Sequence, residues 1–134
     1  MGWTGVSPAQ WATKTERKMD LAVRKIALEL FSRVILKSPV DTGRFRANWQ
    51  VAIGSVPDGT LEIEDKSGTA TISKADASVA GLKAGDVIYL VNNLPYALRL
   101  EDGYSGQAPA GMVGLTVQQF QQIVRQIGAE LVQI

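Results

Sequence analysis

The sequence contains no cysteine and no histidine among its 134 residues. Without cysteine, a disulfide framework, a thiol nucleophile and an iron–sulfur site are excluded. Without histidine, a Ser-His-Asp triad and an imidazole base near neutral pH are excluded, and a zinc or haem site is not expected. Most hydrolytic mechanisms need one of these groups. We therefore expect a binding or structural protein with no catalytic activity, no metal and no cofactor.

Long apolar runs are also missing. No stretch approaches the roughly 20 apolar residues that a bilayer requires, and the start of the chain, Met1 to Gly5, does not resemble a signal peptide. The composition, 46% hydrophobic and 20% charged, is that of a chain that buries one ordinary core. With no internal repeat and no linker, we expect residues 1–134 to form one soluble domain made in a cytoplasm.

The near-zero net charge of +1 hides an asymmetry. Residues 1–50 carry nine basic and four acidic side chains, whereas residues 51–134 carry five basic and nine acidic ones. Oppositely charged halves can steer copies of a chain together or offer a basic face to nucleic acid. The alternative is that both faces are simply solvated, because exposed charges contribute little singly.

The pattern predicts a long helix over residues 8–37. Ser7 is a good N-cap and Pro8 suits the first helical position. Ser38-Pro39 ends the pattern, because the residue before a proline avoids the α region. A helix of this length is roughly 45 Å long.

Two apolar stripes run along this predicted helix. The second stripe consists of Leu21, Leu28 and Ile35, with Phe31 beside it. It is covered either by the rest of the chain or by another subunit, and so small a domain favours the subunit interface slightly. The main stripe suits packing on the domain's own sheet; it comprises Met19, Val23, Ile26, Ala27, Leu30 and Val34.

The rest of the chain predicts an α+β fold, with the long N-terminal helix and a C-terminal helix packed on a small, mainly antiparallel β-sheet. We expect a short helix ending at Ala47 and capped by Asp41 or Thr42. The later elements read as a strand at 49–53, a hairpin of 61–64 and 69–72, a helix at 73–82, a central strand at 87–91, a loop at 96–111 that includes a helical turn at 96–101, a strand at 112–116 and a helix from 117.

Asp41-Thr42-Gly43 has the letters of the aspartic-protease signature, whose chemistry needs neither histidine nor cysteine. Those enzymes are nearly all β and place the motif after an apolar strand. Here a long helix precedes it, and the cation of Arg44 beside it would oppose sharing of a proton. The structural interpretation is stronger: Gly43 lets another backbone come close, and Arg44 and Arg46 pair with Glu101 or Asp102 of this chain or the next.

Two further regions are candidate binding surfaces. Lys14, Arg17, Lys18, Arg24 and Lys25 form a strip that could face phosphates, although leucines interrupt it and no aromatic residues interleave for base stacking. Residues 101–111 hold two adjacent carboxylates, which are weak evidence for a metal site. An interface loop anchored by Tyr104 fits better. Glu62, Glu64 and Asp65 look like ordinary solvent-facing residues.

Two stretches resemble a known family. Residues 38–49, SPVDTGRFRANW, resemble a signature of bacteriophage tail-completion proteins, also called neck or head-to-tail connector proteins. Residues 92–113 resemble that family's second signature through NNLPYA, LE, Gly103, Ser105, QAP and GMV. Order and spacing both match. Asp102 and Gly106 depart from the pattern, where an aromatic and a basic residue are expected.

The resemblance implies a structural subunit that forms a ring, typically a hexamer, at the neck of the virion. It implies contacts with a head-closure or portal-side protein and with a tail terminator or tail tube protein, and double-stranded DNA passing through the lumen without sequence-specific contacts. It implies no catalysis and no cofactor. Contacts with neighbouring subunits or partners are expected from these residues: Leu21, Leu28, Ile35, Asp41, Thr42, Gly43, Arg44, Arg46, Tyr96, Glu101, Tyr104, Gln107, Pro109 and Met112. The alternative is a small, non-specific DNA-binding module that uses the basic helix face.

Overall fold

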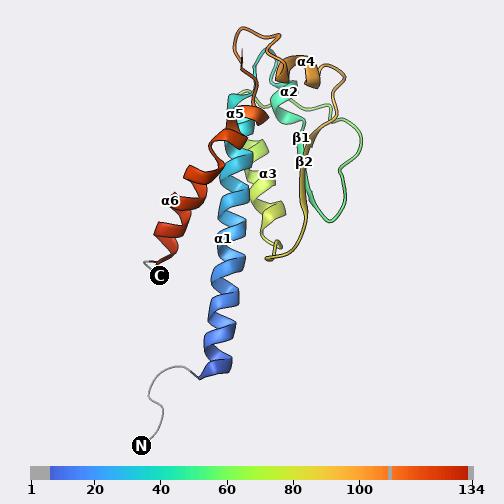
Figure 1. Cartoon of the computed structure of the whole chain (residues 1–134). Coiled ribbons are helices and arrows are strands. Elements are labelled where there is room, and N and C mark those ends of the chain that lie inside the picture. Colours follow the sequence, from blue (N-terminus) through green and yellow to red (C-terminus); the bar gives the residue numbers. More distant parts are fainter. Residues whose placement is uncertain (1–6, 109, 133–134) are drawn as a thin grey trace, which may run out of the picture.

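A long helix, α1 (Pro8–Lys37), is the spine of the computed structural model, which describes residues 7–108 and 110–132 (Figure 1). The other elements lie around its C-terminal two thirds. They are α2 (Arg44–Ala47), β1 (Trp49–Ile53), α3 (Thr69–Val79), β2 (Ile88–Asn92), α4 (Ala97–Glu101), α5 (Val113–Gln118) and α6 (Phe120–Val132). The predicted α+β class, with long helices at both ends of the chain, is confirmed.

The bounds of α1 follow from local chemistry, as predicted. The Ser7 hydroxyl accepts a hydrogen bond from the Gln10 backbone N–H at 3.1 Å, and the Gln10 side chain accepts one from the Ser7 N–H at 2.9 Å. This reciprocal capping box satisfies two N–H groups that have no partner within the helix. Ser38 is extended, with φ −66° and ψ 135°, immediately before Pro39.

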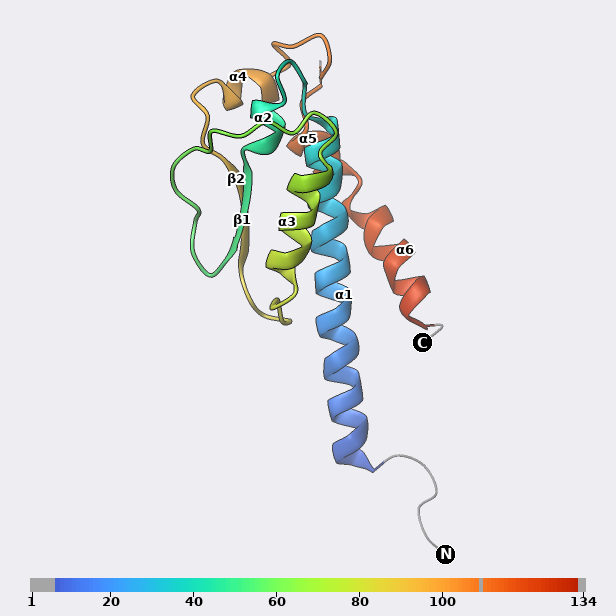
Figure 2. The ribbon, with the colours of Figure 1, turned by 180° about the vertical axis from the view of Figure 1, so that it is seen from behind.

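The sheet of the described residues has two antiparallel strands, in a register that pairs Trp49 with Asn92 and Ile53 with Ile88. Figure 2 shows α3 lying between this sheet and α1. The prediction that residues 87–91 form a central strand is therefore wrong, although both strands lie where the alternation placed them. None of the described helices combines the length and apolar character needed to cross a membrane.

The predicted hairpin of residues 61–64 and 69–72 is wrong. Residues 60–66 follow an irregular path, and Thr69–Val79 is α3, so this helix begins before the expected start at Ser73. Asp65 explains the difference, because its carboxylate accepts hydrogen bonds from the N–H groups of Gly68 and Thr71 at 3.1 and 2.8 Å. A carboxylate at a helix N-terminus stabilises the free N–H groups and the helix dipole.

The strand predicted at residues 112–116 is also wrong. Val113–Gln118 is the short helix α5, and α6 begins at Phe120 instead of Val117. Gly111, at φ +84°, turns the chain immediately before α5, and the Glu101 carboxylate caps the new helix. The apolar pattern here is too short to distinguish a strand from a helix by itself.

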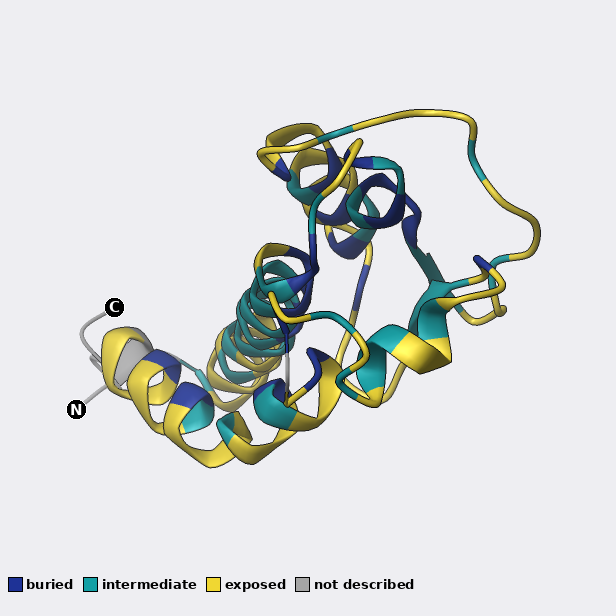
Figure 3. Cartoon of the chain, turned by 90° about the horizontal axis from the view of Figure 1, so that it is seen from above, coloured by how far each residue is buried: buried dark blue, intermediate teal, exposed yellow. Residues whose placement is uncertain are grey.

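The core lies on both sides of α1, as the view in Figure 3 shows. Ile35, Phe45, Trp49 and Met112 belong to one buried cluster. On another side of the helix, Leu21, Ala22, Ile26 and Leu30 pack against Ile123 and Ile127 of α6. A third cluster contains Ala27, Phe31, Val79 and Leu82. Within the second apolar stripe the chain itself covers Phe31 and Ile35, whereas Leu21 and Leu28 are only half-buried, so the slight preference for a subunit interface is corrected at Ile35 and stays a prediction for the two leucines.

Among the described residues, none of the three clusters includes the N-terminal end of α1. Residues 8–14 are all exposed, and the helix projects well beyond the other elements in both Figure 1 and Figure 2. Trp11 is 61% exposed and Met19 is 54% exposed. We call residues 8–19 the arm of α1.

Candidate interaction site

The two sequence signatures meet at the C-terminal end of α1. Gln107, from the second signature, accepts a hydrogen bond from the Val40 N–H at 2.8 Å and donates one to the Val40 carbonyl at 3.0 Å. One amide side chain thus satisfies both backbone groups of a residue 67 positions away. The Asn92 side chain donates to the Phe45 carbonyl at 2.9 Å, and the Tyr96 ring centroid lies 5.9 Å from that of Phe45.

A groove of about 340 Å³ lies between the two signatures. Phe45, 6% exposed, and Leu100 give it apolar walls, and Tyr104 is 73% exposed. The Arg99 guanidinium lies 4.9 Å from the Tyr104 ring centroid, which is cation–π geometry. Six of the predicted interface residues line this groove, namely Asp41, Thr42, Gly43, Tyr96, Tyr104 and Gln107.

Glu101 fixes the C-terminal end of the second signature by hydrogen bonding. Its carboxylate accepts hydrogen bonds from the N–H groups of Met112, Val113 and Gly114, each at 2.9 Å. Burial alone would raise the pKa of Glu101, but these three N–H groups outweigh it and hold the pKa below its usual value. Glu101 therefore closes the loop of residues 102–111 into a defined shape.

Gly43 is a point of close backbone approach in the first signature. Its φ is +92°, and a Cβ at this position would lie 2.7 Å from the Lys66 nitrogen and 2.8 Å from the Asp65 nitrogen. The predicted role in close approach is confirmed. Gly43 holds the N-cap position of α2, so neither Asp41 nor Thr42 is the N-cap residue. The Thr42 hydroxyl nevertheless accepts from the Arg44 N–H at 3.2 Å and so satisfies one free N–H group of this helix, as expected.

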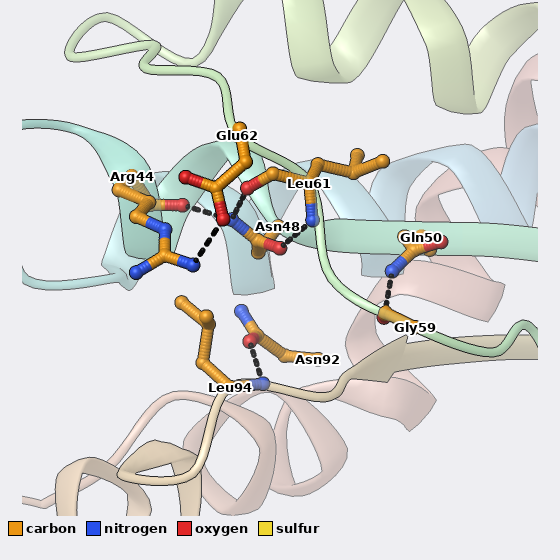
Figure 4. Close-up of polar contacts among 8 residues, drawn as sticks. All are labelled: Arg44, Asn48, Gln50, Gly59, Leu61, Glu62, Asn92 and Leu94. Carbon is orange, nitrogen blue, oxygen red and sulfur yellow. Dashed lines mark hydrogen bonds and ion pairs between the residues drawn. The ribbon is translucent and has the colours of Figure 1, made fainter.

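The two arginines of the first signature do not pair with Glu101 or Asp102 in this chain. Arg44 forms an ion pair with Glu62 at 3.0 Å (Figure 4). Arg46 donates to the backbone carbonyls of Lys66, at 2.7 Å, and of Leu36 and Ser38. Burial lowers the pKa of Arg46, and the charge of Asp65 opposes that change. Arg46 thus joins the end of α1 to the segment before α3 through hydrogen bonds.

Asn48, which our sequence reasoning did not single out, is the polar centre of this region. It is fully buried, accepts from the Leu61 N–H at 2.7 Å, and donates to the carbonyls of Arg44 and Leu61 at 2.7 and 3.0 Å (Figure 4). A neutral amide supplies the two donor hydrogens and the acceptor oxygen that these three bonds use, whereas a hydroxyl has one donor hydrogen. The first signature leaves the position between Ala47 and Trp49 unspecified, so nothing in the sequence marked Asn48.

Asp65 also has a structural role that the sequence did not indicate. Besides the two backbone bonds at the start of α3, its carboxylate accepts from the Thr71 hydroxyl at 2.7 Å. Burial alone would raise its pKa, but the bonds from Thr71, Gly68 and Ser67 outweigh burial and lower the pKa below the usual value. The prediction that Asp65 is an ordinary solvent-facing residue is therefore wrong.

The remaining predicted interface residues divide by burial. Ile35 and Met112 are 0% and 1% exposed, so their assignment to an interface is corrected: both belong to the core. Leu21 and Leu28 are half-buried against other parts of the same chain. Pro109 lies outside the described residues. Across the described residues, no group of three or more acidic side chains is placed to hold a metal ion.

No protein-family model, curated protein or solved structure matches the chain.

Proposed function

We propose that this protein is a structural virion subunit, a tail-completion or neck protein that forms a ring between the head-closure or portal complex and the tail of a bacteriophage. The observation that carries the proposal is that the two signatures, far apart in the sequence, build one groove joined by the Gln107–Val40 bonds. Two resembling motifs that cooperate in one site support a common role better than either motif does alone.

The character of the groove supports binding instead of catalysis. Its lining combines aromatic and aliphatic side chains with backbone, and its carboxylate, Asp41, is exposed on a loop. Aromatic anchors surrounded by a polar rim are typical of protein interfaces. A proton-sharing pair would instead require a second carboxylate close to Asp41 and burial of both.

In this proposal the partners are other copies of the chain, a head-closure or portal-side protein on one face of the ring, and a tail terminator or tail tube protein on the other. Double-stranded DNA passes through the lumen without sequence-specific contacts. The subunit assembles in the host cytoplasm and remains in the neck of the virion. The ring is expected to be a hexamer.

Native mass spectrometry of the purified protein, alone and mixed with head and tail components, tests the proposal. We expect a multimer of defined size that joins tails. Tyr104→Ala should reduce this incorporation, whereas Leu98→Ala is the matched control, because Leu98 is 78% exposed and does not line the groove. A protein that stays monomeric and never enters tails contradicts the proposal.

The second candidate function is a non-specific DNA-binding module. It is favoured by the exposure of Lys14 and Arg17 on the uncovered arm of α1, with Lys18 beside them. Substituting all three with Gln should weaken DNA binding and flatten its dependence on salt. Fluorescence anisotropy at several salt concentrations measures both effects, and Lys74→Gln, on the exposed side of α3, is the control. Unchanged binding rules out this candidate.

A further inference from the structure

Among the described residues, the arm of α1 belongs to none of the core clusters, and its Trp11, Thr15 and Met19 only line an open depression together with residues 83, 84 and 86. An isolated helix of about 12 residues is only marginally stable in water, and most helices in proteins are stabilised by packing of one face. The arm nevertheless presents such a face, because Trp11, Thr15 and Met19 are spaced four residues apart and lie along one side of the helix. An exposed Trp at 61% is the largest apolar group on this face.

The groove between the signatures lies at the opposite end of the same helix. Its first lining residue, Pro39, comes two residues after α1 ends at Lys37. Trp11 and Lys37 are separated by about 39 Å of helix, so Trp11 cannot reach the groove of its own chain. The groove is apolar and of a size that accepts a single large side chain.

Charge complementarity favours a second copy of this chain as the occupant. Lys14 and Lys18 lie three and seven residues after Trp11, which places both cations beside the indole on the helix surface. Asp41 is exposed and lines the groove. An aromatic anchor flanked by cations on the arm thus matches an apolar groove with a carboxylate at the other end of the chain.

We propose that Trp11 of one copy inserts into the groove of the next copy, with Lys14 facing Asp41. The contact joins two different surfaces, so it is head-to-tail, the kind of contact that generates rings when its rotation closes. The inference rests on the proposed ring and specifies which surfaces build it. It also buries the Trp11 side chain, which is 61% exposed in the described structure.

Disulfide trapping tests the contact directly, since the natural sequence has no cysteine to interfere. The full-length chain carrying Thr15→Cys and Thr42→Cys should form a ladder of covalent dimers, trimers and larger species under mild oxidation. Either substitution alone can give at most dimers. The matched control is Thr15→Cys with Ala77→Cys, because Ala77 is exposed on α3 and does not line the groove. No ladder, or an equal ladder from the control pair, overturns the proposal.

Substitutions at the anchor provide a second measurement. Trp11→Ala should lower self-association at least about tenfold, as loss of a central anchor residue does, and should leave the melting temperature unchanged because Trp11 packs in none of the core clusters. Lys14→Glu and Asp41→Lys should each reduce the ladder, and together they should restore it. Failure of the pair to restore it contradicts the proposed contact.

The two proposals fail separately. If Trp11→Ala still forms rings and joins tails as the natural protein does, the arm contact is wrong and the neck function stands. If Trp11→Ala abolishes self-association while the natural protein never joins tails, the arm contact stands and the neck function is wrong.

Discussion

Glu101 provides the sharpest test of the site, because one carboxylate caps α5 and closes the loop of the second signature. Its two oxygens accept from Met112, Val113 and Gly114. In Glu101→Ala the N–H groups of Val113 and Gly114, which are exposed, can bind water, whereas the Met112 N–H is partly buried and loses its partner. Loss of the cap and of the buried bond together should cost about 2–4 kcal/mol of the free energy of unfolding.

The isosteric variant Glu101→Gln separates charge from shape. Its amide oxygen still accepts hydrogen bonds, so we expect a smaller loss of about 1–2 kcal/mol. Asp102→Ala is the matched control, because it removes the adjacent, exposed carboxylate and should change stability by less than about 0.5 kcal/mol. Equilibrium urea unfolding measures all three variants, and the melting temperature should fall by about 3–5 °C per kcal/mol for a domain of this size.

The contribution of Glu101 to the free energy of unfolding should depend on pH in a defined direction. The pKa of Glu101 is lowered in the folded state, so its contribution is fully present above the ordinary glutamate pKa of about 4.3 and is lost as pH falls through the lower, folded-state pKa. The gap in unfolding free energy between the natural protein and Glu101→Gln should therefore be constant near neutral pH and should shrink below about pH 4. A gap that is absent at neutral pH, or that does not change in acid, refutes the capping role.

Three further predictions concern the first signature. In urea unfolding, Gly43→Ala should destabilise the fold by about 1–3 kcal/mol more than Gly85→Ala. Both glycines have φ above +90°, but of the two only Gly43 would bring an added Cβ against backbone atoms. Equal losses would contradict the close approach. Asn48→Asp should lower the free energy of unfolding by about 2–5 kcal/mol at neutral pH, because a buried carboxylate would face the carbonyl groups to which the amide now donates. A stable variant would indicate that Asn48 is in contact with water. Trp49→Ala should lower the free energy of unfolding by about 3–5 kcal/mol, because Trp49 packs in the core. Trp49→Phe should lower it less, since Phe keeps part of the packing and loses the 2.7 Å bond to Ser38. Calorimetry should show this order, and equal losses would assign the effect to the hydrogen bond alone.

The revised role of Glu101 also changes one expectation for assembly. If Glu101 bridged subunits, Glu101→Lys would impair assembly more than folding. With the carboxylate bound to three N–H groups of its own chain, we expect Glu101→Lys to impair folding first. Comparing its unfolding free energy with its self-association distinguishes the two roles.

Several elements were predictable because their signals lie within a few residues of one another. Ser7, Gln10 and Pro39 set both ends of α1 through bonds and steric effects within one helical turn. The alternation around Trp49 and the apolar run ending at Val91 located the two strands. The groove was predictable only in part, through the resemblance of the two signatures.

The errors share a physical cause. Asp65 and Glu101 convert two apparent strands into helices, Asp65 by binding the first turn of α3 and Glu101 by binding N–H groups up to 13 residues away. Periodicity cannot distinguish these outcomes in segments of four or five residues, because a single capping carboxylate is comparable in energy to the difference in propensity. In the sequence Asp65 looked like a solvent-facing residue, and Glu101 looked like an ion-pair partner of Arg44 or Arg46.

The sequence by itself determined the length of α1, the places of β1 and β2 and the absence of thiol and imidazole chemistry, since these follow from neighbouring residues or from composition. The tertiary structure decided what covers each face of α1, where the arginines bind and how Gln107 reaches Val40 across 67 positions. Those choices depend on which distant groups the packed backbone brings within about 3 Å of one another, the range over which a hydrogen bond acts.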